Sequence, residues 1–314
     1  MNIKLPDLQK YKARFVDKGL NYPLPVVKTS ATGLLKSLPP APAGKTDWPW
    51  TIETDPAVYA NNTVWPKLTI VTPSYNQDKF IEETIRSVLL QNYPNLEYII
   101  IDGGSTDNTK KVLEKYSSWI SYWQSEKDNG QSHAINMGFS LADGEYLAWI
   151  NSDDYYLQNV FHTVANRFLQ TKAAFVYGYG YNKSAAEDLE LIKVLPLLDY
   201  FIKIPSLIQP SCFWKFTIHQ PIWEELHCAL DYELWLRMVK GTRKSLITEP
   251  LSVTNIHDEA KTHDPKMAMK WQEDHLKIWA KDAHGSVPEW KRITFLHRLR
   301  KKAYEVFSFI QTKR

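Results

Sequence analysis

Short apolar runs alternate with amphipathic stretches between residues 66 and 260, and each apolar run ends in a polar loop. Leu68–Thr72 and Leu96–Ile101 are rich in β-branched residues, and Tyr146–Ile150 is an unbroken apolar run after an Asp-Gly turn signal. Such runs predict buried strands. Residues 80–91 place apolar side chains at helical spacing. Because strand and helix alternate, we predict an α/β fold, a mostly parallel sheet flanked by helices.

Three polar loops follow the predicted strands. They are Pro73–Asn76, Asp102–Asp107 and Asn151–Asp154. Any one of them could be an ordinary turn. The carboxyl ends of parallel strands meet at one edge of a sheet, and open α/β sheets bind ligands there. Three polar loops at that edge therefore predict a binding site.

The loop Asn151–Asp154 carries two adjacent carboxylates, Asp153 and Asp154, directly after an apolar strand. Carboxylates held close together repel one another, and a bound cation relieves the repulsion. Mg²⁺ and Mn²⁺ prefer oxygen ligands and often bridge carboxylates to substrate phosphates. The alternative is that these residues form only a turn, or an N-cap for the segment that follows. Both interpretations are open at this point.

The totals limit the class of protein. The chain has 314 residues, 44% of them hydrophobic, and a net charge of +3, which gives no sign of nucleic-acid binding. The two cysteines, Cys212 and Cys228, show neither metal-ligand spacing nor a disulfide framework. The first residues lack the apolar segment of a signal peptide, and no apolar run is long enough to span a membrane. We therefore expect a cytoplasmic protein.

The two ends of the chain differ from its centre. Residues 1–65 form a Pro-rich arm without a sustained period, which would lie across the main domain or contact a partner. Residues 66–260 would be the main domain, and 261–314 a helical, basic extension. Between 290 and 314, eight basic residues stand against one glutamate. A basic amphipathic helix of this kind either contacts an anionic membrane peripherally or packs on the core with a solvated basic face.

Six segments carry a further signal through their residues and their order. They are Thr69–Asn76, Ile100–Asp107, Ser125–Gly130 with Ala134–Gly138, Trp149–Asp154, Gln209–Phe213 and Leu230–Arg237. Together they resemble the family 2 glycosyltransferases, which have the GT-A (Rossmann-like) fold and use nucleotide sugars. The resemblance implies an inverting transferase that moves a sugar from a UDP, GDP or dTDP donor to a saccharide or lipid-linked saccharide acceptor in polysaccharide or cell-surface glycan biosynthesis.

The resemblance also implies roles for residues of the donor site. Asp102 would face the nucleobase or ribose, and Pro73 and Tyr75 would form another wall of that pocket. Asp128 stands where family members contact the nucleotide. Asn151, also expected among the donor-binding residues, takes the place of the first acid of the family's Asp-x-Asp motif; its amide oxygen still ligates a cation, but with less charge.

The same resemblance implies a metal site. Asp153 matches the last acid of the Asp-x-Asp motif and would hold a divalent cation, Mn²⁺ or Mg²⁺, that bridges the donor diphosphate. Asp154 is a further candidate ligand. His257 occupies a place where many members carry a histidine that completes the metal or diphosphate site, although a lone histidine is often structural.

On the acceptor side, Asp231 matches the catalytic base that deprotonates the attacking hydroxyl. It also precedes a helical stretch, Tyr232–Lys240, and would serve there as an N-cap; the two roles are compatible. Ser211 and Trp214 would border the acceptor, with Trp214 stacking on a sugar or serving instead as a core aromatic.

Departures from the family pattern keep alternatives open. Gly103 stands where many members have a second acid, Asn151 lacks a charge, and His133 replaces a frequent aspartate. These departures leave room for a non-catalytic nucleotide-sugar or glycan-binding protein on the same fold. A Rossmann dehydrogenase is a weaker alternative, because no Gly-x-Gly-x-x-Gly follows the first strand.

Overall fold

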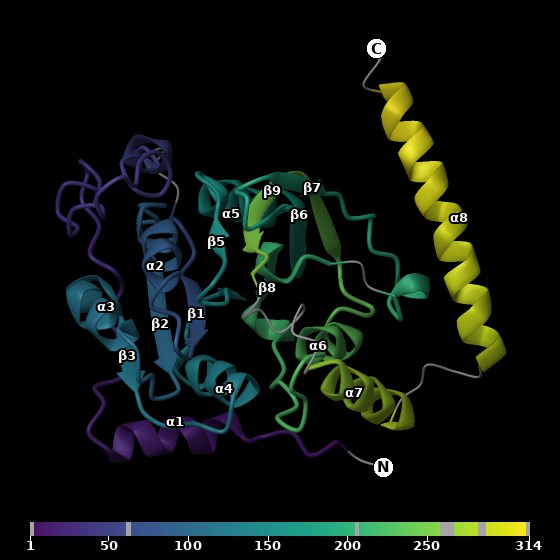
Figure 1. The fold of residues 1–314 in the computed structure, drawn as a ribbon, viewed down its shortest axis with the longest axis horizontal. Coiled ribbons are helices and arrows are strands. Elements are labelled where there is room, and N and C mark those ends of the chain that lie inside the picture. Colours follow the sequence, from purple (N-terminus) through teal and green to yellow (C-terminus); the bar gives the residue numbers. More distant parts are fainter. Residues whose placement is uncertain (1–2, 61–63, 205–206, 258–266, 282–286, 312–314) are drawn as a thin grey trace.

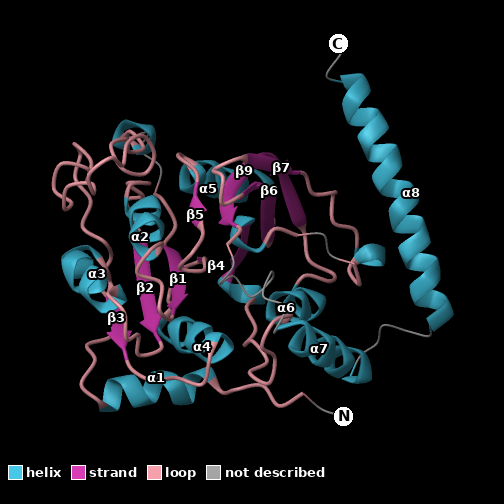
Figure 2. Ribbon diagram, in the orientation of Figure 1, coloured by secondary structure: helices cyan, strands magenta, loops and turns pink. Residues whose placement is uncertain are grey.

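The structure, a computed structural model, describes residues 3–60, 64–204, 207–257, 267–281 and 287–311. Within these residues the strands join one sheet of nine, with helices on its faces (Figures 1 and 2). The helices are α1 (Leu8–Asp17), α2 (Ile81–Leu89), α3 (Thr109–Tyr116), α4 (Gln131–Leu141), α5 (Val160–Thr171), α6 (Leu230–Met238), α7 (Ala268–Lys281) and α8 (Val287–Gln311). The strands are β1 (Leu68–Ser74), β2 (Leu96–Asp102), β3 (Tyr122–Ser125), β4 (Tyr146–Trp149), β5 (Tyr155–Tyr156), β6 (Phe175–Lys183), β7 (Leu189–Ile192), β8 (Cys212–Lys215) and β9 (Lys244–Asn255).

The first half of the sheet is parallel, as the alternation of strand and helix predicts. Its order is β3-β2-β1-β4, and Leu68 of β1 lies in register with Leu96 of β2 and with Tyr146 of β4. Helices α2, α3 and α4 connect these strands, which is the crossover that parallel neighbours require. The carboxyl ends of β1, β2 and β3 therefore lie side by side.

The second half of the sheet is mixed, so the predicted mostly parallel sheet holds for the first four strands only. β8 is antiparallel to β4 and β6, β5 is antiparallel to β9, and only β6 and β9 run parallel. β7 follows β6 after the short connection 184–188 and pairs with it antiparallel. A connection this short cannot reverse the chain twice, so it excludes a parallel pair.

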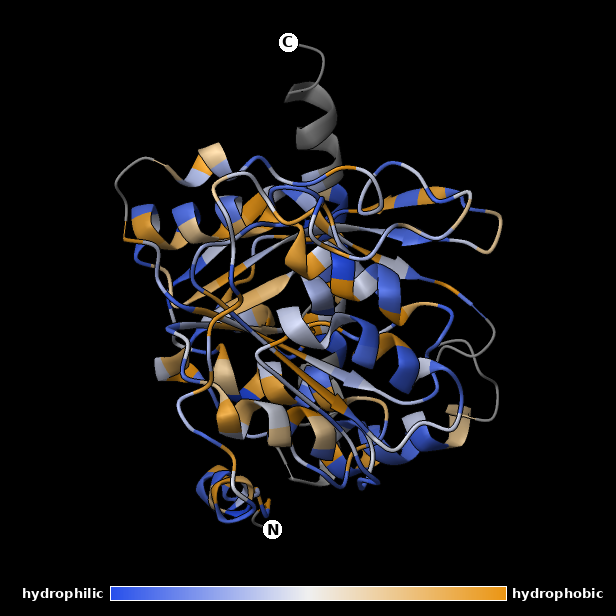
Figure 3. Cartoon of the chain, turned by 90° about the vertical axis from the view of Figure 1, so that its left-hand side faces the viewer, coloured by the Kyte–Doolittle hydropathy of each residue, from blue (hydrophilic) through white to orange (hydrophobic). Residues whose placement is uncertain are grey.

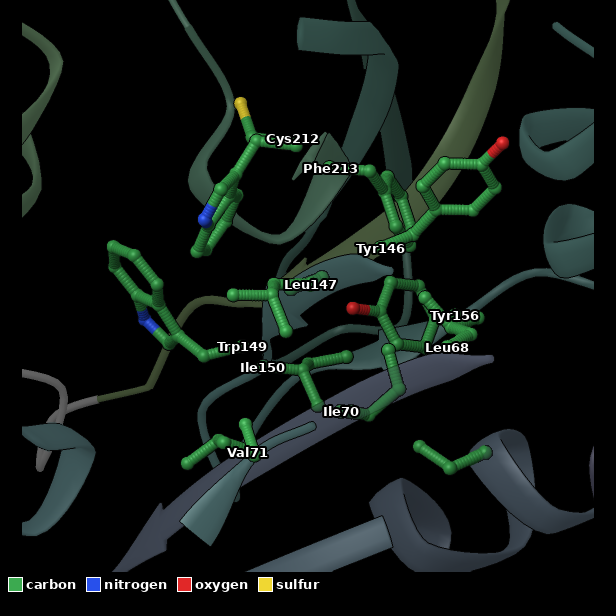
Figure 4. Packing of buried hydrophobic residues seen from close by; sticks show 14 of the residues in the cluster. Leu68, Ile70, Val71, Tyr146, Leu147, Trp149, Ile150, Tyr156, Cys212 and Phe213 are labelled. Atoms are coloured by element: carbon green, nitrogen blue, oxygen red, sulfur yellow. The ribbon is translucent and has the colours of Figure 1, made fainter. Parts of the chain in front are cut away.

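The core lies between the sheet and its helices. Figure 4 shows Val71 of β1, Leu147 and Trp149 of β4 and Phe213 of β8 converging there, and all four are almost fully buried. Hydrophobic and hydrophilic residues alternate along the helices (Figure 3). In α2 the predicted apolar positions at helical spacing, among them Ile85, are all fully buried.

The Pro-rich arm lies across the main domain, which is one of its two predicted arrangements. Its apolar side chains belong to the same buried cluster as the sheet. Arg86 of α2 holds the arm from inside, since its guanidinium donates to the carbonyl oxygens of Pro49 (3.0 Å), Pro39 (2.8 Å) and Trp50 (2.8 Å). Arg86 is only 1% exposed. A buried charge with this many acceptors is stable only while the arm stays in place.

Two helices follow the sheet, as the sequence predicts for the C-terminal extension. α7 packs beside α6, and α8 extends along one side of the molecule (Figure 1). The inner side of α8 contacts the sheet domain, where the Tyr304 and Tyr179 hydroxyls lie 2.9 Å apart and His297 meets the ring of Phe201. Among the described residues, no helix combines the length and apolar character needed to cross a membrane.

We expect the Arg86→Ala variant to lose about 2–4 kcal/mol of unfolding free energy, because three carbonyl oxygens, in two buried hydrogen bonds and one partly buried one, lose their donor. Urea denaturation measures the loss, and limited proteolysis reports whether the arm is released. The exposed Arg243 provides the control, since Arg243→Ala should change stability by less than about 0.5 kcal/mol. Equal stability of the two variants would show that Arg86 does not hold the arm.

Candidate active site

The three polar loops meet at one edge of the sheet. Ser74 at the end of β1 lies in register with Asp102 at the end of β2, and Asp102 in turn with Ser125 at the end of β3. From the next strand, Asn151 reaches the same region, because its side-chain oxygen accepts a 2.8 Å hydrogen bond from the amide of Gln131 at the start of α4. The predicted convergence of these loops is present in the fold.

The loops after β1 and β2 bind each other through reciprocal hydrogen bonds. The backbone N–H of Asn76 donates to Ser105 Oγ (2.7 Å), and the N–H of Thr106 donates to Asn76 Oδ1 (2.8 Å). Asn76 has a positive φ of 52°, a conformation that asparagine tolerates better than most residues. A cavity of about 430 Å³ lies beside these loops. It is lined by Asn76, Gln77, Asp78, Lys79, Phe80, Thr106 and Asp107.

The three predicted nucleoside contacts occupy different environments. Tyr75 is 60% exposed at the end of β1, as a stacking face requires, whereas Pro73 is buried within the strand. Asp102 is fully buried, and its carboxylate accepts hydrogen bonds from Ser105 N (2.8 Å), Ser105 Oγ (2.5 Å) and Ser125 Oγ (2.7 Å). In this structure Asp102 therefore shapes the loops that surround the site and offers no exposed oxygen to a donor.

Asp128 lies directly against Gly103. A Cβ added at Gly103 would come within 3.0 Å of Asp128 Oδ2, so a side chain at position 103 would displace this carboxylate. Asp128 Oδ1 also accepts the N–H of Gly130 (2.7 Å), which turns the chain into α4. Glycine at position 103, a departure from the family pattern, thus has a local reason. The Asp128 carboxylate occupies the space that a side chain at this position would need.

Asn151–Asp154 forms a turn, and that turn presents the predicted metal ligands. The N–H of Asp154 donates to the Asn151 carbonyl (3.1 Å), so these four residues do form the predicted turn. The N-cap interpretation is wrong, because the next helix, α5, begins after Asn159. A turn and a cation site are compatible.

Asp153 and His257 lie together at the surface of this turn. His257 Nε2 is 3.2 Å from Asp153 Oδ2, and both side chains are partly exposed. The ring of His257 stacks on Phe80, with centroids 4.5 Å apart, and Phe80 lines the cavity beside the first two loops. The amide of Asn255 holds the turn from β9 by donating to the Asp153 carbonyl (2.5 Å).

Asp154 lies behind this pair. It is 3% exposed, and its Oδ1 accepts the N–H of Asn255 (3.2 Å). Burial raises the pKa of the Asp154 carboxyl well above its usual range, and the nearby charge of Asp153 raises it further. Among the described residues, no three His, Cys, Asp or Glu side chains converge closely enough to hold a cation by themselves. Asp153, Asp154 and His257 are therefore not brought together as a three-ligand set.

The pair of Asp153 and His257 nevertheless fits a cation that takes its remaining ligands from a diphosphate. A carboxylate oxygen and an imidazole nitrogen are both ordinary ligands for Mn²⁺, and Mg²⁺ commonly uses one or two carboxylates plus phosphate oxygens. A cation beside Asp153 would also relieve the repulsion that raises the pKa of Asp154. The chemistry of the residues present is thus suited to a metal shared with substrate.

Asp231 lies in the first turn of α6. The N-cap of this helix is Ala229, so the interpretation of Asp231 as an N-cap is wrong. The residue as a whole is half-buried. Burial of the carboxyl raises the pKa of Asp231, whereas the neighbouring backbone N–H groups of Tyr232 and of Asp231 itself lower it. A carboxylate with a raised pKa is a stronger base than an aspartate in water.

Ser211 and Trp214 are both fully buried. Ser211 Oγ donates to the Tyr179 carbonyl (2.8 Å) and lies 2.6 Å from Ser252 Oγ, which joins β6 to β9. The Trp214 ring packs edge-on against Trp149 and Trp235. Trp214 is therefore a core aromatic residue in this structure, which is the alternative to the sugar-stacking role. Neither Ser211 nor Trp214 presents an exposed side chain to an acceptor.

Three further residues of the site were given no site role by the sequence patterns. Phe80, Gln131 and Asn255 touch the predicted site residues, yet each comes from a different part of the chain. Only Gln131 carried a local signal, since it opens a predicted helix after a polar loop. The other two depend on how β9 and the loop after β1 pack together.

Comparisons with known proteins agree with this fold and identify a family. The sequence model of the family described as Glycosyl transferase family 2 matches residues 69–208. Of the relatives, the UDP-Glc:alpha-D-GlcNAc-diphosphoundecaprenol beta-1,3-glucosyltransferase WfgD of Escherichia coli is 36% identical over 186 residues, 57% of this chain and 72% of that protein. An uncharacterized glycosyltransferase of Rickettsia typhi is 29% identical over 236 residues, 70% of this chain and 72% of its own.

Solved structures share the fold at lower identity. TarS of S. aureus in complex with UDP-GlcNAc has a TM-score of 0.54 at 17% identity, over 69% of this chain and 68% of that chain. The mannosyltransferase PcManGT of Pyrobaculum calidifontis, in complex with GDP-Man and Mn²⁺, has a TM-score of 0.52 at 18% identity, over 79% and 71%. At these identities the likeness concerns the fold, which is GT-A. With the family match and the identity to WfgD, it follows that this chain belongs to glycosyl transferase family 2.

Proposed function

We propose that this glycosyltransferase moves a sugar from a nucleoside diphosphate sugar to a hydroxyl of a saccharide or lipid-linked saccharide, with inversion at the anomeric carbon. One observation carries the proposal: the fold brings a partly exposed Asp153–His257 pair to the edge where the donor loops meet. Asp231, a carboxyl of raised pKa in the first turn of α6, is the candidate base. The named activity of WfgD, with a UDP-sugar donor and a diphosphoundecaprenol-linked acceptor, supports the substrate classes.

The donor would lie along the loops after β1, β2 and β3. The exposed face of Tyr75 suits a nucleobase, and Asp128 suits a ribose hydroxyl or the nucleotide. Asn151 would face the diphosphate with an uncharged amide, held in place by Gln131. Asp102 supports this pocket indirectly by fixing both loops. The donor class is UDP, GDP or dTDP.

Asp153 and His257 would hold a divalent cation, Mn²⁺ or Mg²⁺, together with the diphosphate. Such a cation supplies Lewis-acid stabilisation of the charge that grows on the departing nucleoside diphosphate. Asp154 lies behind Asp153, and its hydrogen bond from Asn255 helps to fix the turn. The protein's own part is to present Asp153 at the correct place and to keep the turn rigid.

Asp231 would accept the proton of the acceptor hydroxyl as that oxygen attacks the anomeric carbon. The new bond forms on the face opposite the leaving diphosphate, so one displacement inverts the configuration without a covalent intermediate. The raised pKa of the Asp231 carboxyl suits this proton transfer better than that of an ordinary aspartate.

The alternative function, a non-catalytic nucleotide-sugar or glycan-binding protein, draws on two observations. Among the described residues no group of three side chains forms a cation site, and the Asp102 carboxylate is enclosed. This alternative predicts donor binding without turnover and without a response to substitution of Asp231. The experiments below separate the two functions.

For the Asp231→Asn variant we expect kcat to fall by about 10²–10⁴-fold, because the amide cannot accept the proton, while donor affinity stays unchanged. In wild type the base works only when ionised, so kcat should fall as pH drops through the raised pKa of Asp231, at a pH above the usual aspartate range. The exposed Glu225 supplies a matched control, Glu225→Gln. Full activity of Asp231→Asn would exclude it as the base.

Chelation of divalent cations should abolish turnover, and added Mn²⁺ should restore it. Asp153→Ala should raise the Mn²⁺ concentration for half-maximal activity by at least about 100-fold, and His257→Ala by about 10–100-fold, since a neutral ligand contributes less attraction. Titration of activity against Mn²⁺ measures both shifts, with the exposed Asp188→Ala as control. Unchanged metal dependence in both variants would remove the cation from this site.

We also propose that the outward face of α8 contacts an anionic membrane on its cytoplasmic side, where a lipid-linked acceptor would lie. The side chains of this face are all exposed. They are Lys291, Arg292, Phe295, Arg298, Leu299 and Lys302. Phe295 is 62% and Leu299 50% exposed, so apolar surface lies among the basic groups. The opposite face is occupied by contacts with the sheet domain. Basic and apolar groups together match an anionic lipid interface.

Sedimentation with vesicles tests this contact. The full chain should bind phosphatidylserine-containing vesicles and not neutral phosphatidylcholine vesicles. The double substitution Arg298→Glu with Lys302→Glu should weaken binding by more than about tenfold, at about 1 kcal/mol per charge. The same reversal at Lys110 and Lys111, exposed on α3, should leave binding nearly unchanged. Equal loss in both double variants would assign the attraction to net charge alone.

A further inference from the structure

The helix that carries Asp231 begins without a local cap. The N-cap of α6 is Ala229, whose methyl group accepts no hydrogen bond, and no side chain near it in sequence takes that role. Backbone N–H groups at a buried helix start need acceptors, because an unpaired buried N–H is costly. Asp231 lies in the first turn of α6, two residues after Ala229, so the place of its carboxylate depends on how this helix begins.

The missing acceptor comes from another helix. Asp274 of α7 places Oδ2 at 2.8 Å from the N–H of His227, 2.7 Å from that of Cys228 and 3.1 Å from that of Ala229. Three successive N–H groups thus converge on one carboxylate oxygen. Such bonds to an ionised acceptor are stronger than bonds between neutral groups, and a carboxylate at a helix N-terminus also has a favourable interaction with the helix dipole.

Asp274 is fully enclosed at this position. Its exposed fraction is 0%, and its second oxygen, Oδ1, has no hydrogen-bond partner among the described residues. Ile278, one turn further along α7, is buried as well, whereas Glu273 beside Asp274 faces solvent. Asp274 is thus a buried carboxylate, and one of its oxygens binds only the segment at the start of α6 in the hydrogen bonds described above. Such an arrangement indicates a specific role at that helix start.

The segment before α6 is also fixed on its other side, by α4. Ser132 Oγ donates to the Leu226 carbonyl (2.9 Å), and the amide of Asn136 exchanges two hydrogen bonds of 2.8 Å with the backbone of Ile222. α4 therefore holds residues 222–226, and Asp274 holds residues 227–229. Without Asp274, the backbone N–H groups of the three residues that lead into the first turn of α6 would lose this shared acceptor.

We propose that Asp274 is a positioning residue for Asp231: by binding the start of α6 it sets the place and direction of the Asp231 carboxylate. This inference rests on the proposed function, in which Asp231 is the base. It extends the active site into α7, beyond residues 66–260. A displacement of about 1 Å at a reacting group lowers turnover by as much as about 100-fold, so a loosened first turn affects kcat strongly and donor binding little.

The experiment compares Asp274→Ala, Asp274→Asn and the control Glu273→Ala in the full chain, by kcat for sugar transfer and by calorimetric affinity for the donor nucleotide. We expect Asp274→Ala to lower kcat by about 10–100-fold with donor affinity within twofold of wild type. Asp274→Asn, which keeps an acceptor oxygen but no charge, should retain more activity. Glu273→Ala should match wild type. If Asp274→Ala does not fold, Asp274→Asn carries the test with an expected loss of at least about threefold.

A double variant separates positioning from general stability. Asp231→Asn with Asp274→Asn should be no less active than Asp231→Asn alone, because a positioning residue has no effect once the base is absent. The inference is overturned if both Asp274 variants keep wild-type kcat, or if donor affinity falls in parallel with kcat. If Asp231→Asn itself retains full turnover, the proposed function fails, and this inference fails with it for that separate reason.

Discussion

The stack of Trp149 on Trp235 joins the two halves of the candidate active site. The rings are nearly parallel, with an interplanar angle of 13° and centroids 5.5 Å apart, and both are almost fully buried. Trp149 ends β4, just before the turn that carries Asp153, and Trp235 lies one helical turn after Asp231. Because side chains in a packed core have little freedom, this contact fixes the proposed base relative to the proposed metal ligand.

Trp214 completes this aromatic cluster from β8, with ring contacts to both Trp149 and Trp235. The sequence could not distinguish a sugar-stacking tryptophan from a core one, because the same residue type suits both. The ring of Trp214 is buried as a result of the antiparallel pairing of β8 with β4. That pairing joins distant segments and leaves no local pattern. For the same reason, the mixed half of the sheet was not predictable from the alternation of strands and helices.

Local patterns predicted the first half of the molecule well. The apolar runs gave the strands, the helical spacing of residues such as Ile85 gave α2, and the order of the polar loops gave the edge at which they meet. The hydrogen-bond partners of polar side chains were less predictable, because several partners are possible for each of them. Asp102 satisfies its carboxylate within the loops, and the segment that leads into the helix of Asp231 is held by Asp274 of α7, far along the chain.

The departures from the family pattern also have partners in this chain. Gly103 leaves space that the Asp128 carboxylate occupies, Asn151 is held by Gln131, and the ring of His133 meets that of Tyr11 from the N-terminal arm at 5.3 Å. Each departure is thus matched by a neighbouring contact.

In the proposed function, the edge formed by β1, β2 and β4 binds a nucleoside diphosphate sugar through a shared cation. Calorimetric titration of the wild-type chain with UDP-, GDP- and dTDP-sugars, with Mn²⁺ and after chelation, tests this binding most directly. One nucleobase class should bind, and chelation should weaken its binding by at least about tenfold. If no sugar nucleotide binds in the presence of Mn²⁺, the donor site described above does not exist.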